Sequence, residues 1–290
     1  MADTSPQFTL YSDVASQWAY TAHLTLDETG YKPDEYIVKQ VGLLDAENFA
    51  PQYVKINPNG TIPSLTSRSL PHPLIESADV VKYLDSHRPN SSPSLFPADP
   101  TIRTKVDDLI AHVHQMTLST TLILLHARDA EELETKKASP FRAYINKRQE
   151  KLIEYGSAHP EIPLYALRTP DNGHLSHLYN AQNLGPEHES FFEASHRGYR
   201  DFAAGLDMLD SMLVLPFAAG DQVTAADMHV VPWLAHALWG AGGSAVNDFG
   251  PLRELLRKSV PGFEIGDRIK AWWANISASE SFRKNYPTLH

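Results

Sequence analysis

The segment most informative about the fold is Asn57-Pro-Asn-Gly-Thr-Ile-Pro63, which leads directly into the alternating run Ser64-Leu-Thr66. A proline at such a turn is often cis, and the exposed backbone beside it can pair with an extended peptide as an added strand would. We expect Ile62–Thr66 to form one arm of a hairpin, with the short apolar run Leu74–Ile75 as the second arm.

Strand and helix patterns surround this segment. The predicted elements are, in chain order, a strand Phe8–Ser12, a helix through Trp18, Ala22 and Leu26 up to Gly30, a strand Glu35–Lys39, a short helix Leu43–Lys55, the hairpin, and a helix Ser77–Leu84. This β-α-β-α-β-β-α order, with a proline before the third strand, is typical of a thioredoxin-like α/β domain. Pro63 could also serve that fold without any role in binding.

Glu76 and Ser77 stand at the start of the last of these helices. A ligand that carries an α-amino and α-carboxylate group needs an anionic partner and donors at a helix start. Glu76 offers the carboxylate, and Ser77 offers a hydroxyl beside the helix N-terminus. The pair also suits an ordinary helix start, because carboxylates favour that end of the helix dipole.

A Pro- and Ser-rich stretch after the last of these helices predicts a linker. We therefore divide the chain into an α/β domain (1–88), a linker (89–100) and an all-helical domain (101–290). Thr224-Ala-Ala-Asp227 predicts a capping box that starts a helix, and Pro232 predicts a kink in it. Between residues 130 and 200 the periodicity blurs, and Asp171–His174 and Gly185-Pro186 read as turns.

Composition narrows the function. The chain has 290 residues, no cysteine and a formal charge of −10. It therefore has no disulfide, thiolate metal site or cysteine nucleophile, and its negative charge disfavours binding to nucleic acid.

The chain has no apolar run long enough to cross a membrane, and its first residues do not resemble a signal peptide, so we expect a cytoplasmic protein. His174 and His177, predicted in a loop, lack the further ligands of a zinc site. We do not expect a metal site on the predicted helix that carries His112, His114 and His126 either. No metal is therefore expected.

With its cis-proline motif, its Glu76-Ser77 helix start and its Gly220 ahead of Thr224–Asp227, the chain resembles the glutathione transferases, in particular theta-like and long-chain fungal members. The resemblance spans both domains and thins between residues 130 and 200. It implies a thioredoxin-like domain that binds glutathione, followed by a helical domain that forms the pocket for the acceptor substrate, and a twofold homodimer.

The resemblance also implies roles for individual residues. Ile62 would hold the cysteinyl backbone of glutathione next to a cis Pro63, and Glu76 with Ser77 would bind the γ-glutamyl end. Asn48 stands where theta-like members place a histidine for the glycyl carboxylate. Thr61 stands where they usually carry a lysine, so one cationic contact to the tripeptide is missing.

For the chemistry, Leu10–Gln17 resembles the strand-turn-helix of serine-type members. Ser16 is the preferred catalytic residue, with Ser12 and Tyr11 as alternates. Its hydroxyl would donate a hydrogen bond to the sulfur, and the helix N-terminus would add positive potential, so that both favour the thiolate. Ser16 equally suits a purely structural N-cap.

The acceptor pocket of the family lies between the domains. By the resemblance, the residues that would line it are His112, Gln115, Met116, Ser119 and Leu122. Trp18, just after Ser16, would either form the floor of this pocket or belong to the core between the domains. Such walls suit an apolar, electrophilic or conjugated small molecule. Three functions follow: conjugation of glutathione to that molecule, glutathione-dependent isomerisation of a double bond, for example in secondary metabolism, and a non-catalytic regulatory role that keeps the fold.

Overall fold

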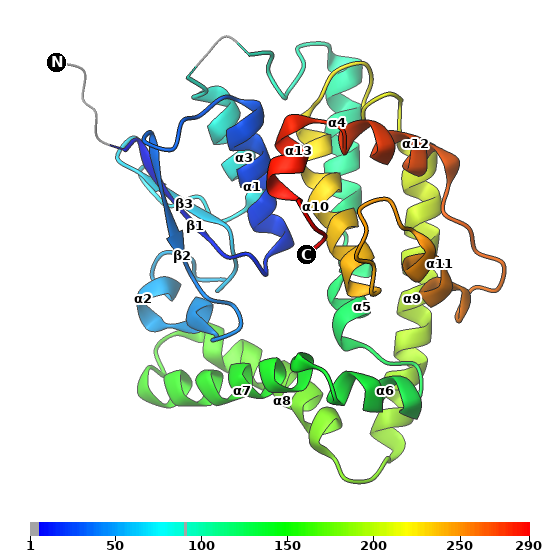
Figure 1. Ribbon diagram of the computed structural model, residues 1–290. Coiled ribbons are helices and arrows are strands. Elements are labelled where there is room, and N and C mark those ends of the chain that lie inside the picture. Colours follow the sequence, from blue (N-terminus) through cyan, green and yellow to red (C-terminus); the bar gives the residue numbers. More distant parts are fainter. Residues whose placement is uncertain (1–5, 90–91) are drawn as a thin grey trace.

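The computed structural model describes residues 6–89 and 92–290. Residues 1–5 of the predicted first domain and 90–91 of the predicted linker lie outside them. The N-terminal half has three strands in the order β2-β1-β3, where β1 (Phe8–Ser12) pairs in parallel with β2 (Tyr36–Gln40) and antiparallel with β3 (Ser64–Ser67). Helices α1 (Gln17–Glu28) and α3 (Ser77–Ser86) pack on one face of this sheet (Figure 1).

Two details of this half differ from the sequence prediction. The helix expected over Leu43–Lys55 is two short pieces, the 3-10 turn η1 (Glu47–Phe49) and the helix α2 (Pro51–Val54). The break falls at Ala50, because a residue before proline is driven to an extended conformation. The second hairpin arm is reduced to one bridge between Leu65 and Leu74.

The C-terminal half is helical, so the predicted fold class is confirmed. Its first part contains α4 (Pro100–Val113), η2 (Met116–Leu118), α5 (Thr121–Leu125), α6 (Ala130–Lys137), α7 (Pro140–Ala158) and α8 (Pro163–Asn180). Its second part contains α9 (Pro186–Met212), α10 (Ala225–Gly240), α11 (Gly250–Arg257), α12 (Asp267–Ile276) and α13 (Glu280–Asn285). In residues 6–89 and 92–290, no helix is both long and apolar enough to span a bilayer.

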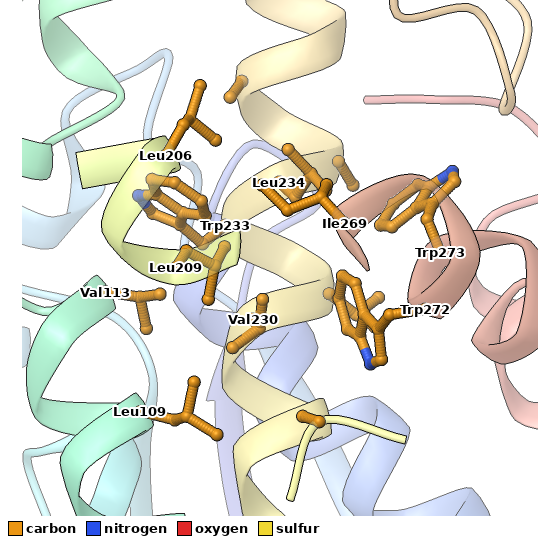
Figure 2. Packing of buried hydrophobic residues seen from close by; sticks show 14 of the residues in the cluster. Leu109, Val113, Leu206, Leu209, Val230, Trp233, Leu234, Ile269, Trp272 and Trp273 are labelled. Atoms are coloured by element: carbon orange, nitrogen blue, oxygen red, sulfur yellow. The ribbon is translucent and has the colours of Figure 1, made fainter. Parts of the chain in front are cut away.

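Helix α10 is the centre of this half. Its residues from Ala225 to Leu238 are all buried, and it packs against α1 and α4. Figure 2 shows Val230, Trp233 and Leu234 of α10 among side chains of α4, α9 and α12. The helix continues through Pro232 and begins after Thr224 as predicted. Across the predicted capping box, Asp227 Oδ2 accepts from the Thr224 N–H at 2.8 Å and from the Thr224 hydroxyl at 3.0 Å.

The segment 130–200 forms helices α6 to α9, and α7 and α8 pack along each other below α2 in Figure 1. The predicted turn at Asp171–His174 is wrong, since α8 runs through it, and His174 and His177 therefore lie on a helix and not in a loop. Contacts with α7 override the local turn signal. Asn172 donates to Gln149 Oε1 at 2.9 Å, and a Cβ on Gly173 would lie 3.1 Å from Gln149 Nε2. Gly185-Pro186 marks the start of α9.

Candidate functional site

A cleft of about 510 Å³ lies between the two halves of the chain. Its lining residues come from the start of α1, the loop before β3, the start of α3, the end of α4 with the following turn, and α8. They are Gln17, Trp18, Asn59, Thr61, Ile62, Pro63, Ile75, Glu76, Ser77, Val113, His114, Gln115, Met116, Ser119 and Arg168. A cavity of about 580 Å³ beside α13 contains none of the predicted site residues.

The loop before β3 forms one wall and is held rigidly from behind. The Ile62–Pro63 peptide bond is cis, as expected. Asn57, fully buried, donates from Nδ2 to the Thr61 carbonyl at 2.8 Å, and the Tyr53 hydroxyl donates to the same carbonyl at 2.6 Å. The Ile62 N–H has no hydrogen-bond partner in the described part of the chain, so it is available to a ligand. Asn57 is a framework residue that the sequence analysis did not single out.

The start of α3 forms the next part of the wall. Glu76 is the exposed N-cap residue, and its carboxylate accepts from Asn59 Nδ2 at 3.3 Å. Ser77 is buried at the first position of the helix. No side chain caps this helix start. The cleft therefore has one carboxylate beside the amide donors of a helix N-terminus, as predicted from the sequence.

Ser16 is the N-cap of α1 and is only 8% exposed. Its hydroxyl accepts from the Ala19 N–H at 3.3 Å and donates to the Ile62 carbonyl at 3.3 Å. Ser16 lies directly behind the cleft wall, whereas its neighbours Gln17 and Trp18 line the cleft itself. The capping role is therefore present, and the hydroxyl lies against the same residue that would meet the ligand.

The two alternates to Ser16 lie elsewhere. Ser12 is buried at the end of β1 and its hydroxyl bonds His23 Nε2 at 2.8 Å. Tyr11 packs beside Tyr53, with Lys39 Nζ 5.7 Å from its ring centre. Neither Ser12 nor Tyr11 lines the cleft.

Four of the predicted acceptor-pocket residues line the cleft: Trp18 from α1, and Gln115, Met116 and Ser119 from the opposite wall. His112 does not reach it, because its Nε2 donates to the Gly205 carbonyl at 2.9 Å inside the helical half. Leu122 packs on the core instead of lining the cleft.

His114 takes the place that His112 was expected to fill. Its ring stacks on Trp18 with 3.9 Å between ring centres, and its Nε2 lies 2.9 Å from Nδ1 of the fully buried His229. Desolvation by these neighbours lowers the pKa of His114 to about 4. Both imidazoles are therefore neutral at pH 7, and burial lowers the pKa of His229 as well. His114 follows the end of α4, which turns it towards the cleft.

Asn48 is not part of the cleft. It is 2% exposed, and its Nδ2 donates to the Gly60 carbonyl at 2.6 Å. Helix α8 packs over this region, with the Tyr165 hydroxyl donating to the Phe49 carbonyl at 2.8 Å. The same helix brings Arg168 to the cleft. No sequence signal pointed to Arg168, because it lies in the segment whose periodicity is blurred.

In residues 6–89 and 92–290, no three His, Asp or Glu side chains are placed to hold one ion.

Comparison with known proteins places this cleft in a family context. Residues 10–92 match the model of the glutathione S-transferase N-terminal domain. The maleylacetoacetate isomerase of Aspergillus fumigatus is 30% identical over 123 residues, which cover 39% of this chain and 52% of that protein. The chain spans about half the length of the curated relatives it matches.

Two solved structures share the fold over nearly the whole chain. Human glutathione S-transferase T1-1 in its apo form has a TM-score of 0.57 at 14% identity, covering 97% of this chain and 88% of that chain. A bacterial Zeta-class maleyl pyruvate isomerase in its holo form has a TM-score of 0.54 at 19% identity, covering 96% of both chains. At these identities the likeness concerns the fold alone.

Proposed function

We propose that this chain, which belongs to the glutathione S-transferase family through its N-terminal domain, binds glutathione in the cleft and activates its thiol for attack on an electrophilic apolar small molecule. The observation that carries the proposal is that a single cleft joins Ile62 and Pro63 to Glu76, Ser77 and the start of α1. These are the three features that a γ-glutamyl tripeptide with a reactive thiol requires.

The tripeptide backbone matches the α/β wall. The unpaired Ile62 N–H would donate to the cysteinyl carbonyl, so that glutathione pairs with this edge as a short added strand. The carboxylate of Glu76 would accept from the γ-glutamyl ammonium group. The Ser77 hydroxyl and the first amides of α3 would donate to the γ-glutamyl carboxylate.

Thiol activation is assigned to Ser16 and the start of α1. The Ser16 hydroxyl now donates over a long 3.3 Å to the Ile62 carbonyl. Rotation about its Cα–Cβ bond would redirect that donor to a sulfur atom held beside Ile62, while the N-terminus of α1 adds positive potential. The unperturbed pKa of a cysteine thiol is ~8.5, and lowering it by about two units corresponds to about 2.7 kcal/mol. The thiol proton leaves to solvent, and the thiolate forms the new C–S bond. The acceptor carbon then either loses its leaving group as an anion or, in a conjugated alkene, gives up its π bond while the neighbouring carbon takes a proton from solvent.

Isomerisation of a conjugated double bond is the second candidate, and the likeness to a maleylacetoacetate isomerase favours it. The thiolate would add to one alkene carbon, and the electron pair of the π bond would move onto the conjugated carbonyl. After rotation the C–S bond breaks, the double bond re-forms and glutathione leaves unchanged. Free glutathione measured before and after turnover separates the two reactions, because conjugation consumes it and isomerisation does not.

Calorimetry with glutathione at pH 7, together with the ultraviolet absorbance of the bound thiolate, tests the proposal. Glu76→Ala should weaken binding at least tenfold, because the ammonium group loses its partner. Ser16→Ala should keep most of the affinity and lose the thiolate signal. Asp79→Ala is the matched control, because Asp79 is an exposed carboxylate of the same helix outside the cleft and pairs with Lys82.

Each outcome decides one point. Absence of wild-type binding at millimolar glutathione would remove the glutathione site and leave the non-catalytic regulatory role. A thiolate signal that survives Ser16→Ala would reduce Ser16 to a helix cap. Assembly as a homodimer is part of the proposal, and light scattering should give twice the 32.3 kDa mass of one chain.

A further inference from the structure

Arg168 is a cation on the cleft wall with no structural task of its own. It is an exposed residue of α8, more than a hundred positions in sequence from the motif residues beside it, Asn59 and Thr61. In the part of the chain that the structure describes, its guanidinium group forms no ion pair and no hydrogen bond. An arginine held at a cleft without a protein partner is available to a ligand.

The position of Arg168 is fixed by the helix that carries it. Tyr165 anchors α8 through its hydrogen bond to the Phe49 carbonyl. Leu164 packs so closely on Gly60 that a Cβ there would lie 2.9 Å from Leu164 Cδ2. Residues four apart share one face of a helix. Arg168 follows Leu164 by that spacing, so the contact at Gly60 sets Arg168 on the side of α8 that faces the cleft, which Asn59 and Thr61 also line.

The charges of the cleft and of glutathione show what Arg168 would bind. Glutathione carries one ammonium and two carboxylate groups. Glu76 matches the ammonium, and Ser77 at the start of α3 matches the γ-glutamyl carboxylate beside it. The other carboxylate, on glycine, needs a separate partner. Among the described lining residues, Arg168 is the one permanent cation, and Asn48, which the resemblance assigned to this end, is buried beneath α8.

We propose that Arg168 binds a carboxylate of the cleft ligand and thereby makes the helical half part of the glutathione site. The carboxylate belongs to the glycyl end of glutathione or to an acidic acceptor molecule, and both present the planar group that a guanidinium pairs with. The inference rests on the proposed function, because it assumes that glutathione occupies this cleft. It gives the protein a means to distinguish glutathione from γ-glutamylcysteine, which lacks the glycine.

Calorimetry with glutathione and with γ-glutamylcysteine tests the glycyl assignment. The wild type should bind glutathione about 5- to 20-fold more tightly than γ-glutamylcysteine, the range expected for an accessible charge-assisted pair. Arg168→Ala should lose that preference by weakening glutathione binding alone, and Arg168→Lys should keep part of it. Arg200→Ala is the matched control, because Arg200 is an exposed, unpaired arginine of α9 outside the cleft.

A second measurement covers the acceptor carboxylate. The binding of maleate and of dimethyl maleate to the glutathione-loaded protein is measured for the wild type and for Arg168→Ala. Selective loss of maleate binding in Arg168→Ala, with unchanged glutathione affinity, would assign Arg168 to an acidic acceptor. If the wild type binds glutathione and Arg168→Ala changes neither the preference for glutathione nor the binding of maleate, the inference is overturned while the proposed function stands. If the wild type does not bind glutathione, the proposed function itself fails, and the inference falls with it.

Discussion

Substitutions of Asp227 should show how much the hydrogen bonds to each oxygen of its buried carboxylate contribute to the free energy of unfolding. Oδ1 accepts from the Trp272 indole N–H at 2.8 Å and from the Ala218 N–H at 2.9 Å. Oδ2 accepts from the Thr224 N–H at 2.8 Å and from the Thr224 hydroxyl at 3.0 Å. Asp227 is fully buried, so these donors have no access to bulk water when the carboxylate is removed.

The magnitude follows from the donors that are left without an acceptor. In Asp227→Ala the hydroxyl can rotate away, but the two amides and the indole N–H cannot. Each unsatisfied buried donor costs about 1–3 kcal/mol, and partial relaxation brings the expected total to about 4 kcal/mol. In Asp227→Asn the amide oxygen keeps both partners of Oδ1, and one donor, the Thr224 N–H, loses its acceptor. That change should cost about 1–2 kcal/mol.

Urea unfolding followed by tryptophan fluorescence measures both variants. Trp233, Trp272 and Trp273 are buried in the same half of the chain and report on it directly. Asp221→Ala is the control, because Asp221 is an exposed carboxylate in the loop that leads to the same helix. A cost below 1 kcal/mol for Asp227→Ala, or equal costs for the alanine and asparagine variants, would refute this account of the carboxylate.

Three further predictions concern packing and pH. Burial lowers the pKa of His236 to about 4, so between pH 6.5 and 4 the folded chain binds fewer protons than the unfolded chain, and the free energy of unfolding decreases as the pH is lowered. In urea titrations, His236→Asn should therefore lose about 2 kcal/mol less stability than the wild type between pH 7 and pH 5. An equal loss would contradict this. Gly60→Ala should destabilise by about 2 kcal/mol, because Gly60 has φ +60° and its new Cβ would meet Leu164; a double-mutant cycle with Leu164→Ala should recover part of that cost, whereas strict additivity would exclude the contact. Tyr165→Phe should cost about 1–2 kcal/mol in urea unfolding by leaving the Phe49 carbonyl unpaired, and a neutral result would mean that water replaces the hydroxyl.

The α/β half could be predicted from the sequence because its signals are local. Alternation marks β1, helical spacing marks α1, and the Ile62-Pro63 pair marks the turn into β3. The prediction was wrong where tertiary contacts outweigh local preference. Asp171–His174 contains ordinary turn residues, yet Asn172 and Gly173 fit against Gln149 of α7 and the helix continues through them.

The residues of the candidate site also divide into those predicted from a local motif and those placed by tertiary contacts. Residues that belong to a continuous motif, such as Ile62 with Pro63 and Glu76 with Ser77, meet in the cleft as the motif suggested. Residues placed by the family resemblance alone met it only in part. Gln115, Met116 and Ser119 line the cleft, whereas His112 faces the helical core and Asn48 is covered by α8. Arg168 could not be predicted because its position depends on how α8 docks on Gly60. That docking is a property of the assembled chain, and no short segment encodes it.

The cleft has one wall from each half of the chain, and this makes every ligand that fills it a measure of how firmly the halves are held together. Separation of the halves destroys the site, so a ligand at 100 times its dissociation constant opposes separation by about 2.7 kcal/mol. The reverse also holds by linkage, because any change that loosens the seam between α1 and α10 lowers ligand affinity without touching a lining residue. Occupancy of the cleft and cohesion of the two halves are thus one coupled equilibrium.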